Sequence, residues 1–533
     1  LTLRFKGAGE TEHRIDVQLA GREILGTATW SGFEDFELEV DLTSVPVSGE
    51  ILTLELIASG GGGDFSYYDG ATLIYARAPA VEDGALAFTA RGQTTAITDF
   101  TSPRIRVLDL SDPAAPKALS GVEITPAATG YQARFATVAG NRYLAVDETG
   151  IAALAPAAEE RAEFQAGEGY DYVVVTPPAE AGAETAEAPT LAEAAEALAE
   201  YRAEQGLGAA VVGLEEIAQR FGGGLSTPQA LSDFIAWAAA NWGTRVLVLA
   251  GTSSYDYRNL LGNNDNLVPT LLAPTPGGLA ACDGCLASDT GVLVGRIPAA
   301  SGEELDAFRA KLRAYEDRAL GRTDAFKLYM LADDAAAEGD FPADTETLLE
   351  ILPRDGEDYA EQLSVTAFAV DPEDRSNAAG AAVTALNSGQ DWANYIGHAG
   401  VTGLASEQLL TVAQIPALTS AQTPIVSALT CVVNRHEVTG FQSLGEALVM
   451  APETGAVAMF GASGTSQNGV AVAFGRDLFS MLFDPADPSH GLPTLGEVID
   501  EALMRNAANA PAFMLSIYKN LLGDPATLLH MLP

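Results

Sequence analysis

Two predicted strands end on side chains with complementary chemistry. The segment that starts at Asn394 reads Asn-Tyr-Ile-Gly-His and ends on His398, and the segment that starts at Ile425 ends on Cys431. A thiolate attacks carbonyl carbons, and an imidazole supplies the proton that the leaving group needs. If both strands lie parallel in one sheet, their carboxyl ends place the two side chains on the same rim. The pair therefore predicts nucleophilic catalysis by a cysteine–histidine dyad.

The histidines are not equivalent, and the cysteine has an alternative interpretation. An isolated cysteine at a strand end is more often a small buried hydrophobe than a nucleophile. His398 lies in a glycine-flanked turn after an apolar strand, where a side chain is presented rather than packed. His436, five positions after Cys431, is its local rival. The other histidines lie in the N-terminal region, after a proline-containing loop and near the C-terminus: His13, His490 and His530.

The elements that must position the dyad alternate between strands and helices from about residue 170. Continuous apolar strands that alternate with helices predict a mainly parallel sheet covered on both faces. We expect two α/β subdomains, residues 165–320 and residues 321–533, with both reactive residues in the second. The expected strands include 171–176, 245–250, 327–331, 392–396 and 424–429, and the expected helices include 191–201 and 228–237.

The N-terminal region has a different pattern. Its segments, for example 36–42 and 52–56, alternate apolar and polar residues and are separated by glycine-rich turns. We therefore predict an antiparallel β-sandwich over residues 1–150. The Ala/Glu-rich stretch from 153 to 187 contains the junction with the next domain.

Composition excludes several classes of function. Lys and Arg number 29 against 72 Asp and Glu, and the resulting net charge of -43 disfavours binding to nucleic acid and to anionic membranes. No apolar run reaches the ~18 residues of a transmembrane helix. The chain opens at Leu1 without a methionine, which suggests a removed leader. Three cysteines are too few for a disulfide framework.

Further motifs occur in order around the dyad, and together they resemble the gingipain-type cysteine peptidases over about residues 165–533. The residues before His398 and Cys431 belong to this pattern. In the N-terminal region, Val107-Leu-Asp-Leu-Ser-Asp-Pro resembles the β-domain that precedes the catalytic unit of bacterial relatives. The resemblance implies a caspase-like α/β fold behind a β-sandwich. The other motifs are Tyr255-Asp-Tyr-Arg, Val294-Gly-Arg-Ile-Pro-Ala, Tyr315-Glu, Ser443-Leu-Gly-Glu-Ala-Leu, Gly455-Ala-Val-Ala-Met-Phe-Gly and Leu522-Gly-Asp-Pro.

The resemblance also implies a role for each catalytic residue. Cys431 is the nucleophile, His398 is the acid/base, and the backbone N–H groups of Cys431 and Ala399 hold the oxyanion. Family members carry glycine after this histidine, so Ala399 would be strained in a turn that needs positive φ. An acid after strand 327–331 orients the histidine. Asp334 is favoured over Asp333 for this role, and a solvated loop is the alternative.

The substrate pocket follows from the same resemblance. Arg-specific members use an acid slightly further along this loop, which Asp340 matches best, with Asp344 as its rival. The opposite wall should come from 462–468, although the tryptophan of gingipains is missing from that segment. The predicted pocket residues are Asp340, Ile396, Leu429, Ser463, Ser466 and Gln467, and the implied specificity is cleavage after Arg or Lys.

No cofactor is expected to be required, and the metal ligands are unknown. The Cys282-Asp-Gly-Cys285 motif lacks the second ligand pair of a zinc site, so a local disulfide is favoured, with free thiols as the alternative. The oxygens of the 262–266 loop, Gly-Asn-Asn-Asp-Asn, could hold calcium as a structural ion, or the loop is simply solvated.

Two classes of function compete. The first is a secreted or cell-surface endopeptidase that acts on protein or peptide substrates. The sequence does not indicate its oligomeric state. The second is a catalytically weak or inactive surface binding or adhesion protein whose β-domain makes the contacts, for which Ala399 is the only hint. A serine hydrolase or a metal hydrolase is disfavoured because the chain lacks a Gly-x-Ser-x-Gly elbow and a His-rich ligand set.

Overall fold

The computed structural model describes residues 1–533 except 8, 10, 20–23, 44–50, 62–63, 65, 152–163, 168, 179–187, 354–359, 376–377, 485–486, 488–492 and 530–533. The chain divides into two compact units. The first consists of Leu1–Lys6 and Thr11–Glu160, and the second consists of Gly7–Glu10 and Arg161–Pro533.

Small sheets make up the first unit, as the alternating pattern predicts. Sheets β4-β1-β6 and β3-β2-β5 share one apolar cluster around Phe5 and Trp30. Sheets β10-β9-β13-β7 and β11-β12-β8 share a second cluster around Phe100 and Phe135. The region predicted as one sandwich therefore has two hydrophobic cores. Its strands are β1 (Thr2–Gly7), β2 (Glu12–Leu19), β3 (Ile24–Ser31), β4 (Asp35–Glu39), β5 (Leu54–Ala58), β6 (Ser66–Thr72), β7 (Ala85–Thr89), β8 (Thr94–Phe100), β9 (Arg106–Asp109), β10 (Lys117–Ala118), β11 (Glu123–Pro126), β12 (Tyr131–Ala136) and β13 (Arg142–Val146).

A ten-stranded sheet organises the second unit and confirms the predicted α/β fold. Its order is β15-β14-β16-β19-β28-β27-β26-β22-β20-β21, and neighbours are parallel except β27 and β28. The antiparallel step at β28 reverses the strand direction between the two halves of the sheet. The strands are β14 (Tyr172–Thr176), β15 (Ala209–Gly213), β16 (Val246–Ala250), β19 (Leu293–Ile297), β20 (Phe326–Ala332), β21 (Leu363–Ala369), β22 (Trp392–Ile396), β26 (Ile425–Leu429), β27 (Ala458–Gly461) and β28 (Leu521–Leu522).

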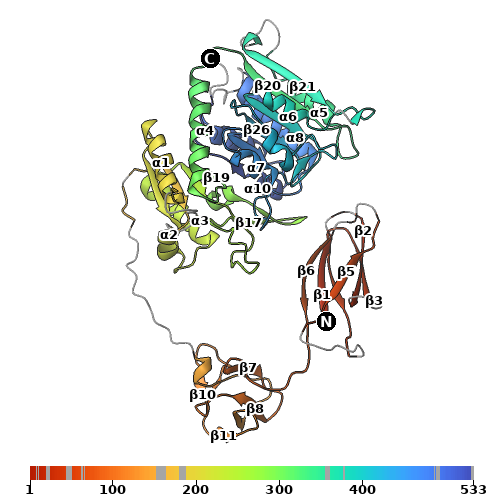
Figure 1. The fold of residues 1–533 in the computed structure, drawn as a ribbon, viewed down its shortest axis with the longest axis vertical. Helices are drawn as coiled ribbons and strands as arrows, with labels where there is room; N and C mark the ends of the chain where they lie inside the picture. Colours follow the sequence, from red (N-terminus) through yellow and green to blue (C-terminus); the bar gives the residue numbers. More distant parts are fainter. Residues whose placement is uncertain are drawn as a thin grey trace. The chain divides into compact units, whose positions relative to one another are not determined.

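Helices cover both faces of this sheet because its strands are apolar on both sides. In β14, Tyr172 and Val174 join the cluster of α1 and α4, whereas Val173 and Val175 join the cluster of α2 and α3. In the other half, α6 and α7 cover one face and α5 and α8 the other. The helices are α1 (Leu191–Glu204), α2 (Leu214–Phe221), α3 (Pro228–Trp242), α4 (Gly302–Leu320, the long green helix of Figure 1), α5 (Phe341–Leu349), α6 (Ala381–Asn387), α7 (Leu444–Met450), α8 (Asn468–Phe483), α9 (Leu495–Asn506) and α10 (Ala512–Tyr518).

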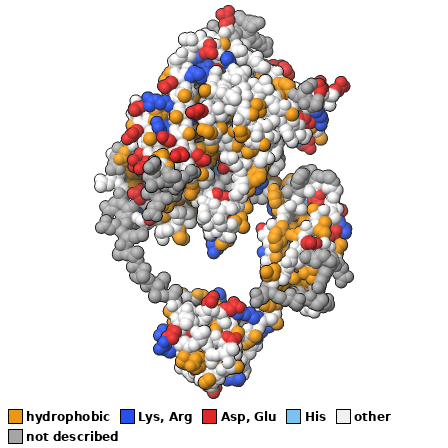
Figure 2. Space-filling view, in the orientation of Figure 1, with side chains coloured by type: hydrophobic (Ala, Val, Ile, Leu, Met, Phe, Trp, Pro, Cys, Tyr) orange, Lys and Arg blue, Asp and Glu red, His pale blue; other side chains and the backbone are white. Residues whose placement is uncertain are grey.

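Short elements complete the second unit. Strands β17 (Leu272–Thr275) and β18 (Gly278–Ala281) form a hairpin, and β23 (Ala399–Gly400), β24 (Gly403–Leu404) and β25 (Leu410–Thr411) form a small sheet just after His398. Acidic side chains are scattered over the face that Figure 2 shows. Within the described part of the chain, no helix has the length and apolar character needed to cross a membrane.

Candidate active site

Strands β22 and β26 bring the two reactive residues to one edge of the sheet. They are neighbouring parallel strands, and Ile396 is paired with Leu429 where they end. His398 and Cys431 each follow two positions later, so they occupy equivalent places in the register. Because adjacent strands lie about 4.8 Å apart, this register puts the imidazole-bearing and thiol-bearing residues next to each other at the carboxyl ends.

The Cys431 thiol is half-buried against the segment that follows β27. The backbone N–H of Ser466 donates to Sγ at 3.3 Å, and the Ser466 carbonyl oxygen lies 3.7 Å from Sγ. Burial raises the pKa of the Cys431 thiol, and the Ser466 N–H opposes part of this rise because it stabilises the thiolate. A neighbouring base must therefore take the thiol proton before attack. Cys431 is the chain's free cysteine.

The backbone around the thiol is held in an unusual conformation. Val432 has φ 45°, a value that a β-branched residue rarely adopts. Its N–H donates to the Gly464 carbonyl oxygen at 3.1 Å, which ties the turn to the same segment that holds Sγ. Within the described part of the chain, the N–H of Cys431 has no protein acceptor. The predicted role as an oxyanion donor requires an N–H without a protein acceptor.

The His398 ring lies between a carboxylate and an aromatic ring. Its Nε2 is 3.5 Å from the Glu338 Oε2, and the two side chains are 49% and 66% exposed. The Phe341 ring meets the imidazole edge to face, with centroids 5.1 Å apart. A carboxylate near a ring nitrogen can orient an imidazole. Glu338, rather than the Asp334 favoured from sequence, is the carboxylate near the ring.

The backbone of the histidine turn is bonded on both sides. The His398 N–H donates to Asp333 Oδ2 at 3.1 Å, and the His398 carbonyl oxygen accepts from the Tyr395 hydroxyl at 2.5 Å. Gly397 sits between these partners with φ +155°, where an added Cβ would lie 2.3 Å from the Asp333 Cβ and 2.5 Å from the Tyr395 hydroxyl. Only glycine fits this close approach.

The structure does not place Asp334 at the imidazole. Its carboxylate pairs with Arg375, which also contacts Glu407 Oε1 at 3.2 Å. Carboxylate oxygens of Asp333, Asp334 and Glu407 lie within 4.8 Å of one another, so Arg375 neutralises part of a crowded acidic group. Burial raises the pKa of the Asp333 carboxyl, which is 3% exposed. The attraction of Arg375 explains why Asp334 turns away from the histidine.

The strain expected at Ala399 is absent. Ala399 begins β23, pairs with Leu404 and has no positive φ. The left-handed conformation nearby belongs to Ala405, with φ 55°. Because extended backbone suits any residue, alanine after the histidine does not distort the turn, and the prediction of strain was wrong.

Three of the predicted pocket residues are internal. Ile396, Leu429 and Ser463 are at most 1% exposed. Leu429 packs toward Gly475 of α8, and the Ser463 hydroxyl donates to the Ala281 carbonyl oxygen at 2.7 Å. They belong to the core behind the site, so their assignment to a substrate pocket was wrong.

The two acids proposed for the pocket base differ in environment. Asp340 is exposed and caps α5, where it accepts the Ala343 N–H at 3.2 Å. It cannot be a buried pocket base, and that prediction was wrong. Asp344 lies one turn later and accepts from the Asn468 side-chain amide at 2.7 Å, at the start of α8. Asp344 therefore faces the segment predicted as the opposite wall.

The remaining wall residues lie on that segment. Ser466 contacts the thiol through its backbone, and its hydroxyl is 2.9 Å from the Tyr518 hydroxyl. Gln467 is exposed just before α8, and its N–H points at the Met514 sulfur at 3.3 Å. Of the predicted wall residues, Ser466 contacts Cys431, and Gln467 follows it as an exposed residue.

The rival histidine is locked in a buried network. The His436 Nδ1 is 2.7 Å from the Ser253 hydroxyl, and its Nε2 is 3.4 Å from Asp283 Oδ2. Burial lowers the pKa of His436 to about 4. Asp283 also forms a bidentate pair with buried Arg296 at 2.7 and 2.8 Å. His436 is therefore a neutral structural residue.

The other candidate motifs fall outside the site. Cys282 and Cys285 form a disulfide, as favoured from sequence. His13 is bonded to Asp64 at 2.6 Å within the N-terminal unit. His490 and His530 lie outside the described residues.

The asparagine-rich loop predicted to bind calcium is cross-linked to its neighbours. Asn263 donates to the Thr439 hydroxyl at 2.8 Å, and the Gly440 N–H donates to Asp265 at 2.7 Å. The Asn266 side-chain oxygen accepts the Ser254 N–H at 3.0 Å. The Asp265 and Asn266 oxygens already accept from protein donors, and calcium at this loop stays a prediction.

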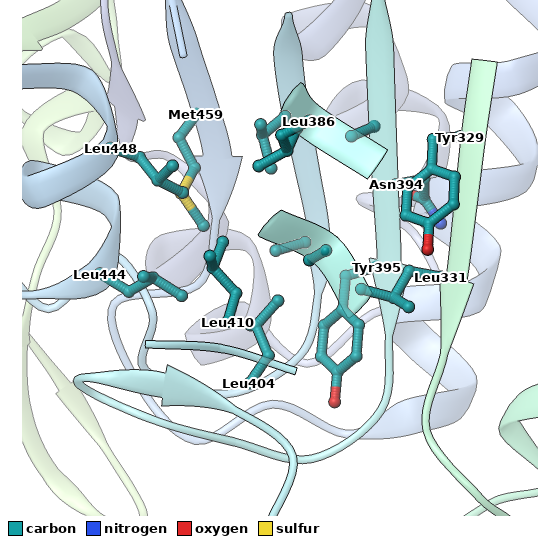
Figure 3. Close-up of a pocket in the computed structure, with 14 residues that line it drawn as sticks. Tyr329, Leu331, Leu386, Asn394, Tyr395, Leu404, Leu410, Leu444, Leu448 and Met459 are labelled. Atoms are coloured by element: carbon teal, nitrogen blue, oxygen red, sulfur yellow. The ribbon is translucent and has the colours of Figure 1, made fainter. Parts of the chain in front are cut away.

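An apolar cavity of about 30 Å³ lies behind the histidine strand, between the sheet and helices α6 and α7 (Figure 3). The Tyr395 ring lies beside Leu331 in its wall, and the tyrosine hydroxyl points away from the aliphatic side chains. The cavity is part of the core rather than a substrate pocket. Its wall anchors the ring whose hydroxyl bonds the His398 carbonyl.

Sequence reasoning did not single out Glu338, Thr430 and Tyr395, which contact His398 or its turn. Glu338 stands in the same short acidic segment as Asp340, but no local pattern distinguishes the acid that reaches the ring. Thr430 and Tyr395 adjoin the reactive residues, so proximity to the strand ends was the available signal.

Known proteins resemble this chain in sequence and in fold. Residues 165–530 match the sequence model of Peptidase family C25. The structure of the RgpB pro- and mature domains of Porphyromonas gingivalis is 18% identical, with a TM-score of 0.52 over 67% of this chain and 79% of that one. The Arg-specific cysteine proteinase gingipain R is 17% identical, with a TM-score of 0.52 over 70% and 80% of the two chains. At these identities the structural similarity shows the fold alone. No curated protein matches the chain.

Proposed function

The chain belongs to peptidase family C25, and from this premise we propose that it is an endopeptidase that works through a Cys431 thioester. As a member of the family it is a cysteine peptidase with protein or peptide substrates. In the proposed reaction His398 is the acid/base and Glu338 orients its ring. The observation that carries the proposal is the shared register of His398 and Cys431 at the ends of adjacent parallel strands.

The proposed chemistry follows from the groups at this edge. His398 takes the Cys431 proton, and the thiolate attacks the scissile carbonyl carbon to form a tetrahedral oxyanion. The Cys431 N–H and, in the family pattern, the Ala399 N–H donate to that oxyanion. Collapse breaks the peptide C–N bond, His398 returns the proton to the leaving amine, and a thioester remains. Water activated by His398 then hydrolyses the thioester and frees the thiol. We expect the Sγ and the imidazole to lie about 3–7 Å apart in the resting enzyme.

We further propose cleavage after Arg or Lys. The support is the acidic segment beside the dyad, in which Glu338 reaches the histidine and Asp344 faces the wall before α8. A carboxylate that pairs with a guanidinium discriminates against neutral side chains, which would leave it unpaired. The net charge of -43 would also draw basic peptides toward the enzyme.

We propose that the enzyme acts outside the cell or at its surface. The disulfide between Cys282 and Cys285 supports this location because such bonds persist in oxidising compartments. An inactive binding protein is a weaker alternative, because the Ala399 hint is removed by the extended backbone at that residue.

The test is peptide hydrolysis by the full chain. A mixture of peptides incubated with the parent should be cut at internal bonds, and Cys431→Ala should lower kcat by several orders of magnitude without changing the circular dichroism spectrum. Equal cleavage by parent and variant would show another nucleophile. No cleavage by a folded parent at any peptide would favour the binding role.

A further inference from the structure

We propose that the Thr430 hydroxyl is a positioning group that sets the spacing between His398 and Cys431. The proposal rests on the peptidase function proposed above. Thr430 directly precedes Cys431 and is 3% exposed. Its Oγ donates to the carbonyl oxygen of Gly397, the residue directly before His398, at 2.5 Å. One side chain thus joins the two turns at the positions next to both reactive residues.

Hydrogen bonds fix the turn that contains Gly397 and His398 to the sheet. Asp333, at the end of β20, accepts the His398 N–H at 3.1 Å. Tyr395 of β22 donates to the His398 carbonyl oxygen, and so does the Ala405 N–H at 2.9 Å. These bonds fix the turn relative to β20 and β22 but do not reach β26. The Thr430 bond joins this turn to the residue before Cys431, at the end of β26.

Other residues fix the turn that contains Thr430 and Cys431. The Tyr518 hydroxyl lies 3.3 Å from the Thr430 carbonyl oxygen and 2.9 Å from the Ser466 hydroxyl. The Ser466 N–H in turn donates to Sγ at 3.3 Å. Tyr518 is fully buried, so its ring is a rigid support for this chain of contacts. Thr430 therefore stands where the two supported turns meet.

Loss of the hydroxyl should affect geometry rather than substrate binding. A displacement of about 1 Å in a reacting group can cost about 10²-fold in rate. Thr430 has no access to substrate because it is buried behind the two turns. The expected signature is therefore a fall in kcat with little change in KM, together with altered reactivity of the Cys431 thiol.

The test compares Thr430→Val, which keeps the shape and removes the hydroxyl, with Thr430→Ser, which keeps the hydroxyl. Thr430→Ala is a second hydroxyl deletion in case the valine variant does not fold. For each full-length protein we would measure kcat and KM on a peptide substrate and the pH dependence of Cys431 alkylation by iodoacetamide. In the described part of the chain, the titratable groups around the dyad include Glu338 at the ring, Asp333 at the backbone and the Tyr518 hydroxyl near the thiol, and all three remain in every variant.

We expect kcat to fall about 10- to 100-fold in the valine or alanine variant, KM to change less than about twofold, and serine to restore most of the rate. Alkylation should shift to higher pH when the hydroxyl is lost, because the thiol then meets His398 less closely. Unchanged kcat and alkylation after loss of the hydroxyl would overturn the proposal, as would a serine variant as impaired as the valine one. If the parent cleaves no peptide, the peptidase proposal fails, and the alkylation profiles still decide the role of Thr430.

Discussion

His398 and Cys431 stand at equivalent positions on adjacent parallel strands, each two residues beyond the paired residues Ile396 and Leu429. The sheet therefore brings the turns that carry them side by side. The thiol is also bonded by the Ser466 N–H, and the imidazole lies beside Glu338. The residues proposed as nucleophile, base and orienting acid thus come from three separate segments of the chain.

The first prediction concerns Glu338. Replacing it by glutamine removes the charge near Nε2 of His398, and we expect kcat to fall about tenfold or more with KM little changed. Steady-state kinetics on one peptide substrate measures both constants. Glu346→Gln, an exposed acid on α5, is the matched control and should leave kcat unchanged. Equal kcat in parent and Glu338→Gln would remove this residue from the mechanism.

A second prediction separates the two candidate specificity acids. Asp344→Asn should lower kcat/KM for Arg substrates about 10-fold or more relative to Gln substrates, since a charge-assisted hydrogen bond is lost. Asp340→Asn should leave the preference unchanged because Asp340 is an exposed helix cap. The assay uses peptides that differ only in Arg, Lys, Gln or Leu before the scissile bond. A parent that prefers Leu or Gln would refute basic specificity altogether.

A third prediction concerns pH and Glu437. This side chain is 2% exposed, one oxygen is 3.2 Å from the Arg435 Nε, and burial raises its pKa from 4.5 to about 7. Between these values the folded state binds more protons than the unfolded state, so this group's contribution to stability is present below about pH 4.5 and is lost as pH rises to about 7. Glu437→Gln should therefore gain stability relative to the parent across this window. Urea unfolding at several pH values tests it, and a parallel pH dependence in both proteins would contradict it.

The fourth prediction concerns the buried pair of Asp283 and Arg296. Both side chains are at most 1% exposed, and removal of the acid leaves a buried guanidinium charge. We expect Asp283→Asn to lower the free energy of unfolding by about 3–5 kcal/mol. Asp306→Asn, in the partly exposed pair with Arg309, should change it by less than about 1 kcal/mol. Similar losses in both variants would show that the buried pair stabilises the fold no more than the partly exposed pair does.

The strands and the neighbouring positions of His398 and Cys431 could be predicted because they depend on local pattern. Apolar runs that end on His398 and Cys431 define two buried strands, and the parallel arrangement of such strands brings their ends together. The all-β character of the N-terminal region also follows from alternation. Its two separate cores could not be inferred, because alternation identifies strands but not which sheets pack together.

The acid nearest to His398 and the surroundings of the expected pocket residues could not be predicted because they depend on distant partners. Asp334 turns toward Arg375, which is 41 positions away in the sequence. Asp340 caps the first turn of α5, where it accepts the Ala343 N–H. The Ser463 hydroxyl donates to the carbonyl oxygen of Ala281, which is distant in the sequence. Ala399 was expected to be strained because relatives have glycine there, yet its backbone is extended in β23.

Covalent trapping tests the central claim most directly. A peptidyl ketone that ends in arginine should modify the folded parent once, and peptide mass spectrometry should place the adduct on Cys431. His398→Ala should react much more slowly under the same conditions, since the thiol then lacks its base. An adduct on another residue, or equal labelling rates of Cys431 with and without His398, would contradict the dyad.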